Sequence, residues 1–205
     1  MLRCLVLLAA PLALCRVEPS TGIDFPEKRS GQSLVGVGVR KKGPIKVYGV
    51  GMYVDSLSSK LSMSKFKSTA LDKVDDAFYK ACVEGGFGKT LVLKMKLGVS
   101  REKMAGAIAE SVKPRMTGDK GAVSKLEESL LTGCEKFAVD GRAGAGTEFS
   151  FAMRGGNMGV SVNGKDVTTI KSQALCHALL NCYLDGKTVS PALKATCAEG
   201  ILASL

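Results

Sequence analysis

The stretch LVGVGVRKKGPIKVYGVGMYV, residues 34–54, contains two valine-rich apolar runs that are separated by basic residues, a glycine and a proline. Residues alternate in character along Ser33–Arg40, which is typical of a β-strand with one buried face. Ile45–Val54 has the same character and predicts a second strand. Lys41-Lys42-Gly43 fits a three-residue hairpin loop with the glycine in the left-handed conformation. The stretch therefore predicts an antiparallel hairpin.

One face of the first predicted strand combines glycines with a positive charge. Alternation places Leu34, Gly36, Gly38 and Arg40 on the same face. Glycine weakens a strand unless another group approaches its backbone closely. These positions therefore predict a slot beside the Arg40 guanidinium. A strand that simply ends in solvent at Arg40 is the alternative interpretation.

The length of the hairpin loop decides whether Arg40 can act together with Tyr48. A three-residue loop would place Arg40 opposite Pro44, with Tyr48 on the same face. A four-residue loop would place Arg40 and Tyr48 on opposite faces, and the sequence leaves both possibilities open. On a shared face, the Tyr48 hydroxyl could donate a hydrogen bond beside the Arg40 fork, and together they could bind a carboxylate.

The rest of the chain arranges strands and helices in blocks. Lys89–Leu97 predicts a third strand, and Thr147–Arg154 with Met158–Asn163 predicts a second hairpin. Helical spacing and helix caps predict helices at Leu57–Lys67, Ala70–Glu84, Ser100–Lys113, Ala122–Phe137, Ile170–Asp185 and from Ser190-Pro191 onward. Strands, helices, strands and helices in this order predict an α+β protein with an antiparallel sheet covered by helices.

The first 31 residues differ from the rest in composition. Residues 1–15, MLRCLVLLAAPLALC, have an early positive charge, an apolar run and a polar exit, as secretory signal peptides do. A short buried or membrane-anchoring helix is the alternative. Residues 16–31 lack periodicity and predict a linker, which leaves residues 32–205 as the domain. We expect the leader to direct the protein to the secretory pathway or to a plastid, with no stable membrane span once it is removed.

Composition narrows the classes of function. The net charge of +10 favours an anionic partner such as a nucleic acid, an anionic membrane or a carboxylate ligand. We expect no nucleic-acid binding, because the lysines are dispersed and few aromatic residues could stack on bases. The seven cysteines contain no C-x-x-C pair, so we expect no metal site. The five cysteines beyond the leader are expected to be buried as small hydrophobes.

These motifs together resemble the chalcone isomerase superfamily. The pattern G-x-G-x-R followed by K-V-Y-x-x-G-x-Y-V carries the resemblance. The segments LVLKMKLGVSREKMAGAIAESV and IKSQALCHALLNCYLDGKTVSPALK extend it over residues 33–205. The resemblance implies an open-faced β-sandwich, in which a layer of α-helices covers a large antiparallel sheet and leaves a cleft between the layers.

The resemblance also implies which residues form the site. True chalcone isomerases use a strand arginine, a threonine on the next strand, and a tyrosine and an asparagine on the helix after the third strand. Arg40 matches the arginine, but Tyr48, Met104 and Ser111 stand at the other three positions. Methionine has no proton to donate, and losing preorganised donors costs orders of magnitude in rate. Chalcone cyclisation is therefore not expected.

The departures point to the fatty-acid-binding branch of the superfamily. There the strand arginine and a tyrosine of the K-V-Y segment bind the ligand carboxylate, and Arg40 and Tyr48 match them. We expect a monomer that binds a fatty acid, with no cofactor and no catalysis. Residual intramolecular lyase activity on a chalcone-like phenolic, or a non-catalytic role as partner of another enzyme, are the alternatives. The other residues expected to line the pocket are Met104, Ile108 and Ser111 on the helix and Val50 and Met52 on the sheet.

Overall fold

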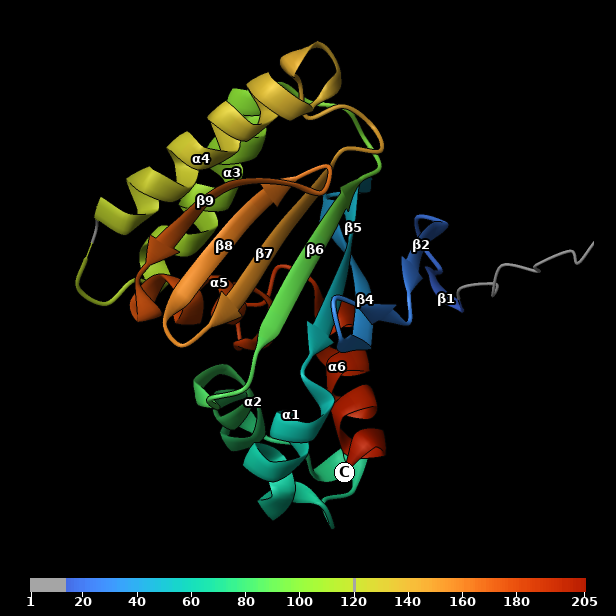
Figure 1. The fold of residues 1–205 in the computed structure, drawn as a ribbon. Helices are drawn as coiled ribbons and strands as arrows, with labels where there is room; N and C mark the ends of the chain where they lie inside the picture. Colours follow the sequence, from blue (N-terminus) through green and yellow to red (C-terminus); the bar gives the residue numbers. More distant parts are fainter. Residues whose placement is uncertain (1–13, 120) are drawn as a thin grey trace, which may run out of the picture.

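The computed structural model describes residues 14–119 and 121–205, and a seven-stranded antiparallel sheet dominates it (Figure 1). The expected leader, residues 1–15, lies outside the described residues except for its last two. The strands follow one another in space in the order β3 (Lys28–Arg29), β4 (Gln32–Lys42), β5 (Ile45–Val54), β6 (Lys89–Met95), β7 (Glu148–Arg154), β8 (Asn157–Val162) and β9 (Lys165–Lys171). Neighbours in sequence thus pair directly, which confirms the predicted α+β class.

Helices lie over one face of this sheet and beyond one of its ends (Figure 1). They are α1 (Ser56–Met63), α2 (Asp76–Glu84), α3 (Arg101–Val112), α4 (Gly121–Phe137), α5 (Gln173–Leu184) and α6 (Pro191–Ser204), with short 3-10 turns η1 (Ser64–Phe66), η2 (Leu71–Lys73), η3 (Lys113–Arg115) and η4 (Val139–Gly141). Helix α4 packs on β8 and β9, α5 on β8, and α6 on β4. This layer over one sheet confirms the expected open-faced β-sandwich.

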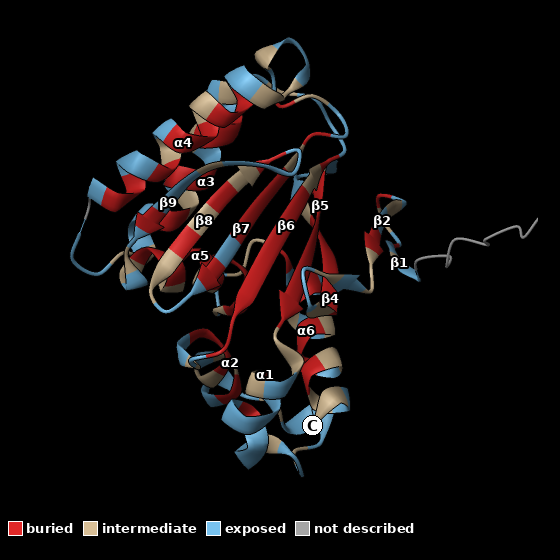
Figure 2. Cartoon of the chain, viewed as in Figure 1, coloured by how far each residue is buried: buried red, intermediate tan, exposed pale blue. Residues whose placement is uncertain are grey.

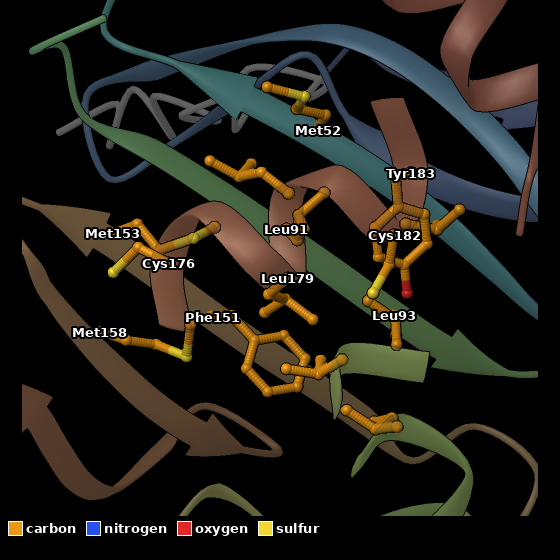
Figure 3. Packing of buried hydrophobic residues seen from close by; sticks show 14 of the residues in the cluster. Met52, Leu91, Leu93, Phe151, Met153, Met158, Cys176, Leu179, Cys182 and Tyr183 are labelled. Atoms are coloured by element: carbon orange, nitrogen blue, oxygen red, sulfur yellow. The ribbon is translucent and has the colours of Figure 1, made fainter. Parts of the chain in front are cut away.

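The main hydrophobic core lies between the sheet and the helices. Strand β6 is buried along almost its whole length, and β5 is buried from Tyr48 to Val54 (Figure 2). Figure 3 shows how sulfur-containing side chains fill the space between branched and aromatic ones: Met52, Met153, Met158, Cys176 and Cys182 lie among Leu91, Leu93, Phe151 and Leu179. The buried cysteines are free thiols, namely Cys82, Cys134, Cys176, Cys182 and Cys197. Their predicted role as small hydrophobes is confirmed.

The turn between β4 and β5 is shorter than the sequence predicts. Lys42 pairs with Ile45, so Gly43-Pro44 forms a two-residue turn, with Gly43 at φ +59°. The register then shifts by one residue, and Arg40 pairs directly with Tyr48. The expected pairing of Arg40 with Pro44 is therefore wrong. The shared face of Arg40 and Tyr48 is confirmed, because cross-strand partners project to the same side of a sheet.

The two strand glycines serve helix packing rather than a ligand. A Cβ on Gly38 would lie 2.3 Å from the backbone nitrogen of Leu193, and one on Gly36 would lie 2.7 Å from that of Cys197. Both contacts belong to α6, which fills the space that we expected to be a slot beside Arg40. Leu34 does not share this face, because a register shift after it turns its side chain to the opposite side of the sheet.

Residues 16–31 form structure instead of the expected linker. Strands β1 (Cys15–Glu18) and β2 (Ile23–Pro26) make an antiparallel hairpin. Phe25 is fully buried in a second cluster on the far face of the sheet. A Cβ on Gly51 would lie 2.6 Å from the Phe25 ring, so the glycine admits the aromatic side chain. Burial of one aromatic ring thus orders a segment whose prolines and glycines indicated a loop.

Helix α6 also closes the exposed edge of β4. The Val37 backbone N–H donates to Thr196 Oγ1 over 3.1 Å, and the same hydroxyl donates to the Val37 carbonyl over 2.7 Å. One threonine therefore satisfies both backbone groups that an edge strand leaves unpaired at this residue. At the other edge, β9 has exposed residues along most of its length.

The β9 strand was missed by the sequence prediction. The expected helix over Ile170–Asp185 begins instead at Gln173, because Ser172 caps it and Lys165–Lys171 pairs with β8. The polar sequence KDVTTIK does not alternate strongly enough to stand out as an edge strand. Within the described residues, no helix is long and apolar enough to cross a membrane.

Candidate functional site

A cavity of about 510 Å³ opens at the turn end of the β4–β5 hairpin, between these strands and α3. It brings together five residues that the sequence singles out: Arg40, Tyr48, Met104, Ile108 and Ser111. Val47 and Val99 also line it, although the sequence analysis did not assign them to the site. The hairpin and α3, about 60 residues apart in the sequence, thus form one site.

Val50 and Met52 do not line this cavity. Both are fully buried, and the Met52 sulfur lies 3.6 Å from the Cys197 Sγ on α6. They share the sheet face of Tyr48 but lie further along β5, where the core is filled. The prediction that they line the pocket is therefore wrong. Alternation in the sequence shows which face of a strand a residue lies on, but it does not show where along the strand the packed core ends.

Arg40 reaches the cavity with an uncommitted guanidinium. Among the described residues it forms no ion pair, and its Nη1 donates a long hydrogen bond of 3.5 Å to the Val189 carbonyl. A guanidinium offers five N–H donors. Most of its capacity to bind an anion is therefore available to a ligand.

Tyr48 presents a neutral hydroxyl beside this charge. Its side chain is buried, and its hydroxyl lies 3.0 Å from the hydroxyl of Tyr183 on α5. Burial raises the pKa of Tyr48 to about 12, although the Tyr183 hydrogen bond and the Arg40 charge oppose the rise. Burial also raises the pKa of Tyr183 well above its usual value. Both hydroxyls therefore keep their protons at physiological pH.

Helix α3 supplies the apolar wall of the cavity. Ser100 caps the helix through a hydrogen bond from the Lys103 backbone N–H, and this fixes the turn that carries Met104. The Met104 and Ile108 side chains are nearly fully buried. The Ser111 hydroxyl donates to the Ala107 carbonyl over 2.8 Å, so its proton is already used within the helix.

Charged side chains surround the opening. Lys42, Lys103, Glu102 and Glu110 line the cavity and are exposed. Hydrogen bonds from its own backbone N–H and from Arg101 lower the pKa of Glu102, which is therefore ionised and paired. Neither glutamate of the lining forms an ion pair with Arg40.

Tyr183, the hydrogen-bond partner of Tyr48, is a further residue that sequence reasoning missed. It lies in α5, whose residues from Ala178 to Leu184 are nearly all buried. A tyrosine in such an apolar helix is predicted to be a core residue. The sequence pattern does not show which group its hydroxyl contacts. The long-range pairing of β5 with its neighbours, and of α5 with the sheet, brings the two tyrosines together.

Comparison with known proteins agrees with this geometry. The profile of the chalcone isomerase-like family matches residues 22–197. Chalcone isomerase-like protein 1 of Humulus lupulus is 31% identical over 180 residues, which cover 82% of this chain and 81% of that protein. Fatty-acid-binding protein 1 of Arabidopsis thaliana is 27% identical over 179 residues, and the match covers 82% of this chain and 63% of that protein.

A solved structure shows the same fold. The crystal structure of an Arabidopsis thaliana fatty-acid binding protein superposes with a TM-score of 0.77 at 22% identity, covering 93% of this chain and 98% of that one. The match to the family profile begins at residue 22, inside the β1–β2 hairpin. The family profile therefore covers β2 but not β1. This chain belongs to the chalcone isomerase-like family.

Proposed function

We propose that this protein binds a fatty acid without converting it, with the carboxylate on Arg40 and Tyr48 and the acyl chain in the cavity. The observation that carries the proposal is that the Arg40 guanidinium, which forms no ion pair within the described part of the chain, stands beside the neutral, buried Tyr48 hydroxyl at the wall of one cavity. Hydrogen bonds from a charged donor to a carboxylate are about twice as strong as neutral ones. Together, the Arg40 guanidinium and the Tyr48 hydroxyl on adjacent strands fix both the position and the orientation of the carboxylate.

The cavity also suits an acyl chain. Its volume of about 510 Å³ lies in the range of small-molecule sites. Met104, Ile108, Val47 and Val99 give it apolar walls, and methionine adapts readily to a flexible chain. Burial contributes about 0.8 kcal/mol per methylene. The chain therefore supplies affinity, and Arg40 supplies orientation.

The comparisons support a lipid ligand. One relative and one solved structure of the same fold are named as fatty-acid-binding proteins. The residues at the site agree with binding rather than isomerisation. Met104 has no proton to donate, and the Ser111 hydroxyl is already hydrogen-bonded to Ala107. Neither residue can replace the donors on which chalcone cyclisation depends.

Titration with oleate tests the proposal. Displacement of a fluorescent fatty acid would measure the dissociation constant for the wild-type protein and for Arg40→Gln. We expect Arg40→Gln to weaken oleate binding roughly 10- to 100-fold, because a hydrogen bond to a charged group contributes about 1.5–3 kcal/mol.

Arg101→Gln is the matched control. Arg101 lies at the start of α3 but pairs with Glu102 and Glu135 rather than facing the inner cavity. Its removal should leave oleate binding nearly unchanged. Equal losses in the two variants would exclude a specific clamp, and a wild-type protein that binds no oleate would refute the proposed function.

A further inference from the structure

The hydrogen bond between Tyr48 and Tyr183 contains one proton, and its direction decides what Tyr48 can offer a ligand. The two hydroxyl oxygens lie 3.0 Å apart, and either could donate. If Tyr48 donates to Tyr183, only the Tyr48 lone pairs face the cavity. If Tyr183 donates to Tyr48, the Tyr48 proton is available to the cavity.

The surroundings of Tyr183 favour the second arrangement. Its side chain is almost fully buried, and within the described part of the chain its hydroxyl has no hydrogen-bond partner other than Tyr48. The nearby Cys182 thiol is directed to the carbonyls of Ser111 and Ala178. A buried donor without a partner is strongly unfavourable, so the Tyr183 proton goes to Tyr48.

Tyr48 has the alternative that Tyr183 lacks. It lines the cavity, and its direct strand partner is the cationic Arg40. A ligand or a water molecule in the cavity can accept its proton. A guanidinium carries no lone pair to accept this proton, so both residues act as donors toward the same space.

We infer that Tyr183 holds Tyr48 as a hydrogen-bond donor beside the Arg40 guanidinium, so that these two residues select an ionised carboxylate over a neutral lipid headgroup. The inference rests on the proposed function and names the chemistry of its headgroup. A carboxylate has only acceptors, which match the Arg40 and Tyr48 donors. An alcohol lacks the charge that strengthens both bonds, and it leaves the Arg40 guanidinium without a counter-ion.

The other charged groups that line the cavity do not change this choice. Lys42 and Lys103 are exposed at the opening and add positive charge. Glu102 and Glu110 are also exposed, and Glu102 is paired with Arg101. Their carboxylates belong to the solvated opening, where screening is strong. Tyr183 is thus a positioning residue that acts through Tyr48.

A double-mutant cycle tests the inference. Dissociation constants for oleate and for oleyl alcohol would be measured with the wild type, Tyr183→Phe, Tyr48→Phe and the double variant. We expect Tyr183→Phe to weaken oleate binding roughly fivefold to tenfold, because the Tyr48 donor loses its fixed orientation. Oleyl alcohol should bind all four proteins with dissociation constants within about twofold, since its affinity comes from the chain.

Two further results separate positioning from a general structural role. In the Tyr48→Phe background, adding Tyr183→Phe should not weaken oleate binding further. The carboxyl ¹³C resonance of bound [1-¹³C]oleate should titrate at a higher pH in Tyr183→Phe than in the wild type, because a Tyr48 donor that is no longer held in place stabilises the ionised form less. Tyr79→Phe is the control, since the Tyr79 hydroxyl donates elsewhere, to the Lys194 carbonyl.

The possible outcomes are distinct. If the wild type and Tyr183→Phe bind oleate equally well and the carboxyl titration does not shift, the inference is wrong. The proposed function would still stand in that case. Equal losses for oleate and oleyl alcohol would also overturn it. Wild-type protein that binds neither lipid would overturn the proposed function and the inference with it.

Discussion

Arg40 and Tyr48 are direct cross-strand partners because β5 carries one extra residue, Val47, next to this pair. A two-residue turn without that bulge would shift Tyr48 by one position and turn it to the other face. The same bulge makes Val47 part of the cavity lining. A local irregularity of the hairpin thus assembles both the polar and the apolar parts of the site.

Gly38 should tolerate no larger residue. In Gly38→Ala, the new Cβ would lie 2.3 Å from the Leu193 backbone nitrogen, and the helix backbone cannot rotate away as a side chain can. We expect the free energy of unfolding to fall by roughly 1–3 kcal/mol, as in other overpacked sites, in urea denaturation. Gly86→Ala is the control, because a Cβ there would meet nothing within 4 Å. An unchanged stability of Gly38→Ala would contradict the packing of α6.

Phe25 should stabilise the whole domain although it precedes the main sheet. Its ring is fully buried with Tyr53 and Val92 on the far face, so Phe25→Ala leaves a cavity. We expect a loss of about 3–5 kcal/mol in thermal or urea unfolding, as for other buried aromatic residues. Leu57→Ala provides the comparison, since Leu57 is 72% exposed and should change stability little. A Phe25→Ala protein as stable as the wild type would mean that the hairpin does not cover the sheet.

The protein should lose stability in alkaline solution. Burial raises the pKa of Tyr48 from 10.0 to about 12, whereas an exposed tyrosine in the unfolded chain titrates near 10. Between these values the unfolded chain binds fewer protons, so the free energy of unfolding falls as the pH rises. For Tyr48 alone the decrease amounts to roughly 2–3 kcal/mol across this window. Urea denaturation from pH 9 to 12 should show a shallower decline for Tyr48→Phe, and an identical decline would contradict the burial of this hydroxyl.

Chalcone cyclisation should proceed no faster with the protein than without it. Met104 supplies no proton and Ser111 is bonded to Ala107, so two of the four groups that the resemblance implies for cyclisation cannot donate to the developing charge. Absorbance of a hydroxychalcone over time measures the rate, with heat-denatured protein as the control. An acceleration of more than about tenfold, lost in Arg40→Gln, would restore the isomerase alternative.

The sequence predicted the elements of the central hairpin more reliably than its details. Valine-rich alternation located β4 and β5, but bulges decide which residues share a face, and alternation counted along the strand misplaced Leu34. The role of Gly36 and Gly38 could not be read from their neighbours, because the group that approaches them is about 155 residues away in α6.

Elements stabilised by distant contacts were the ones that local patterns missed. The segment before β3 contains prolines and glycines, yet Phe25 orders it by packing onto Gly51. Strand β9 was missed for a related reason. It is an edge strand that is mostly exposed, so its sequence is polar and lacks the apolar alternation of a buried strand. At the site, the motif residues Arg40, Tyr48 and Met104 were found, whereas Tyr183 depends on tertiary packing.

The sheet has two edges that are protected from aggregation by different means. At β4, the Thr196 side chain of α6 hydrogen-bonds both backbone groups of Val37, so protection there lasts only while the C-terminal helix stays docked. At β9, charged residues such as Lys165, Asp166 and Lys171 discourage pairing with another chain. Detachment of α6 would therefore uncover a long, valine-rich strand. Loss of the C-terminal helix, by truncation or proteolysis, should therefore cause the domain to assemble edge to edge through β4.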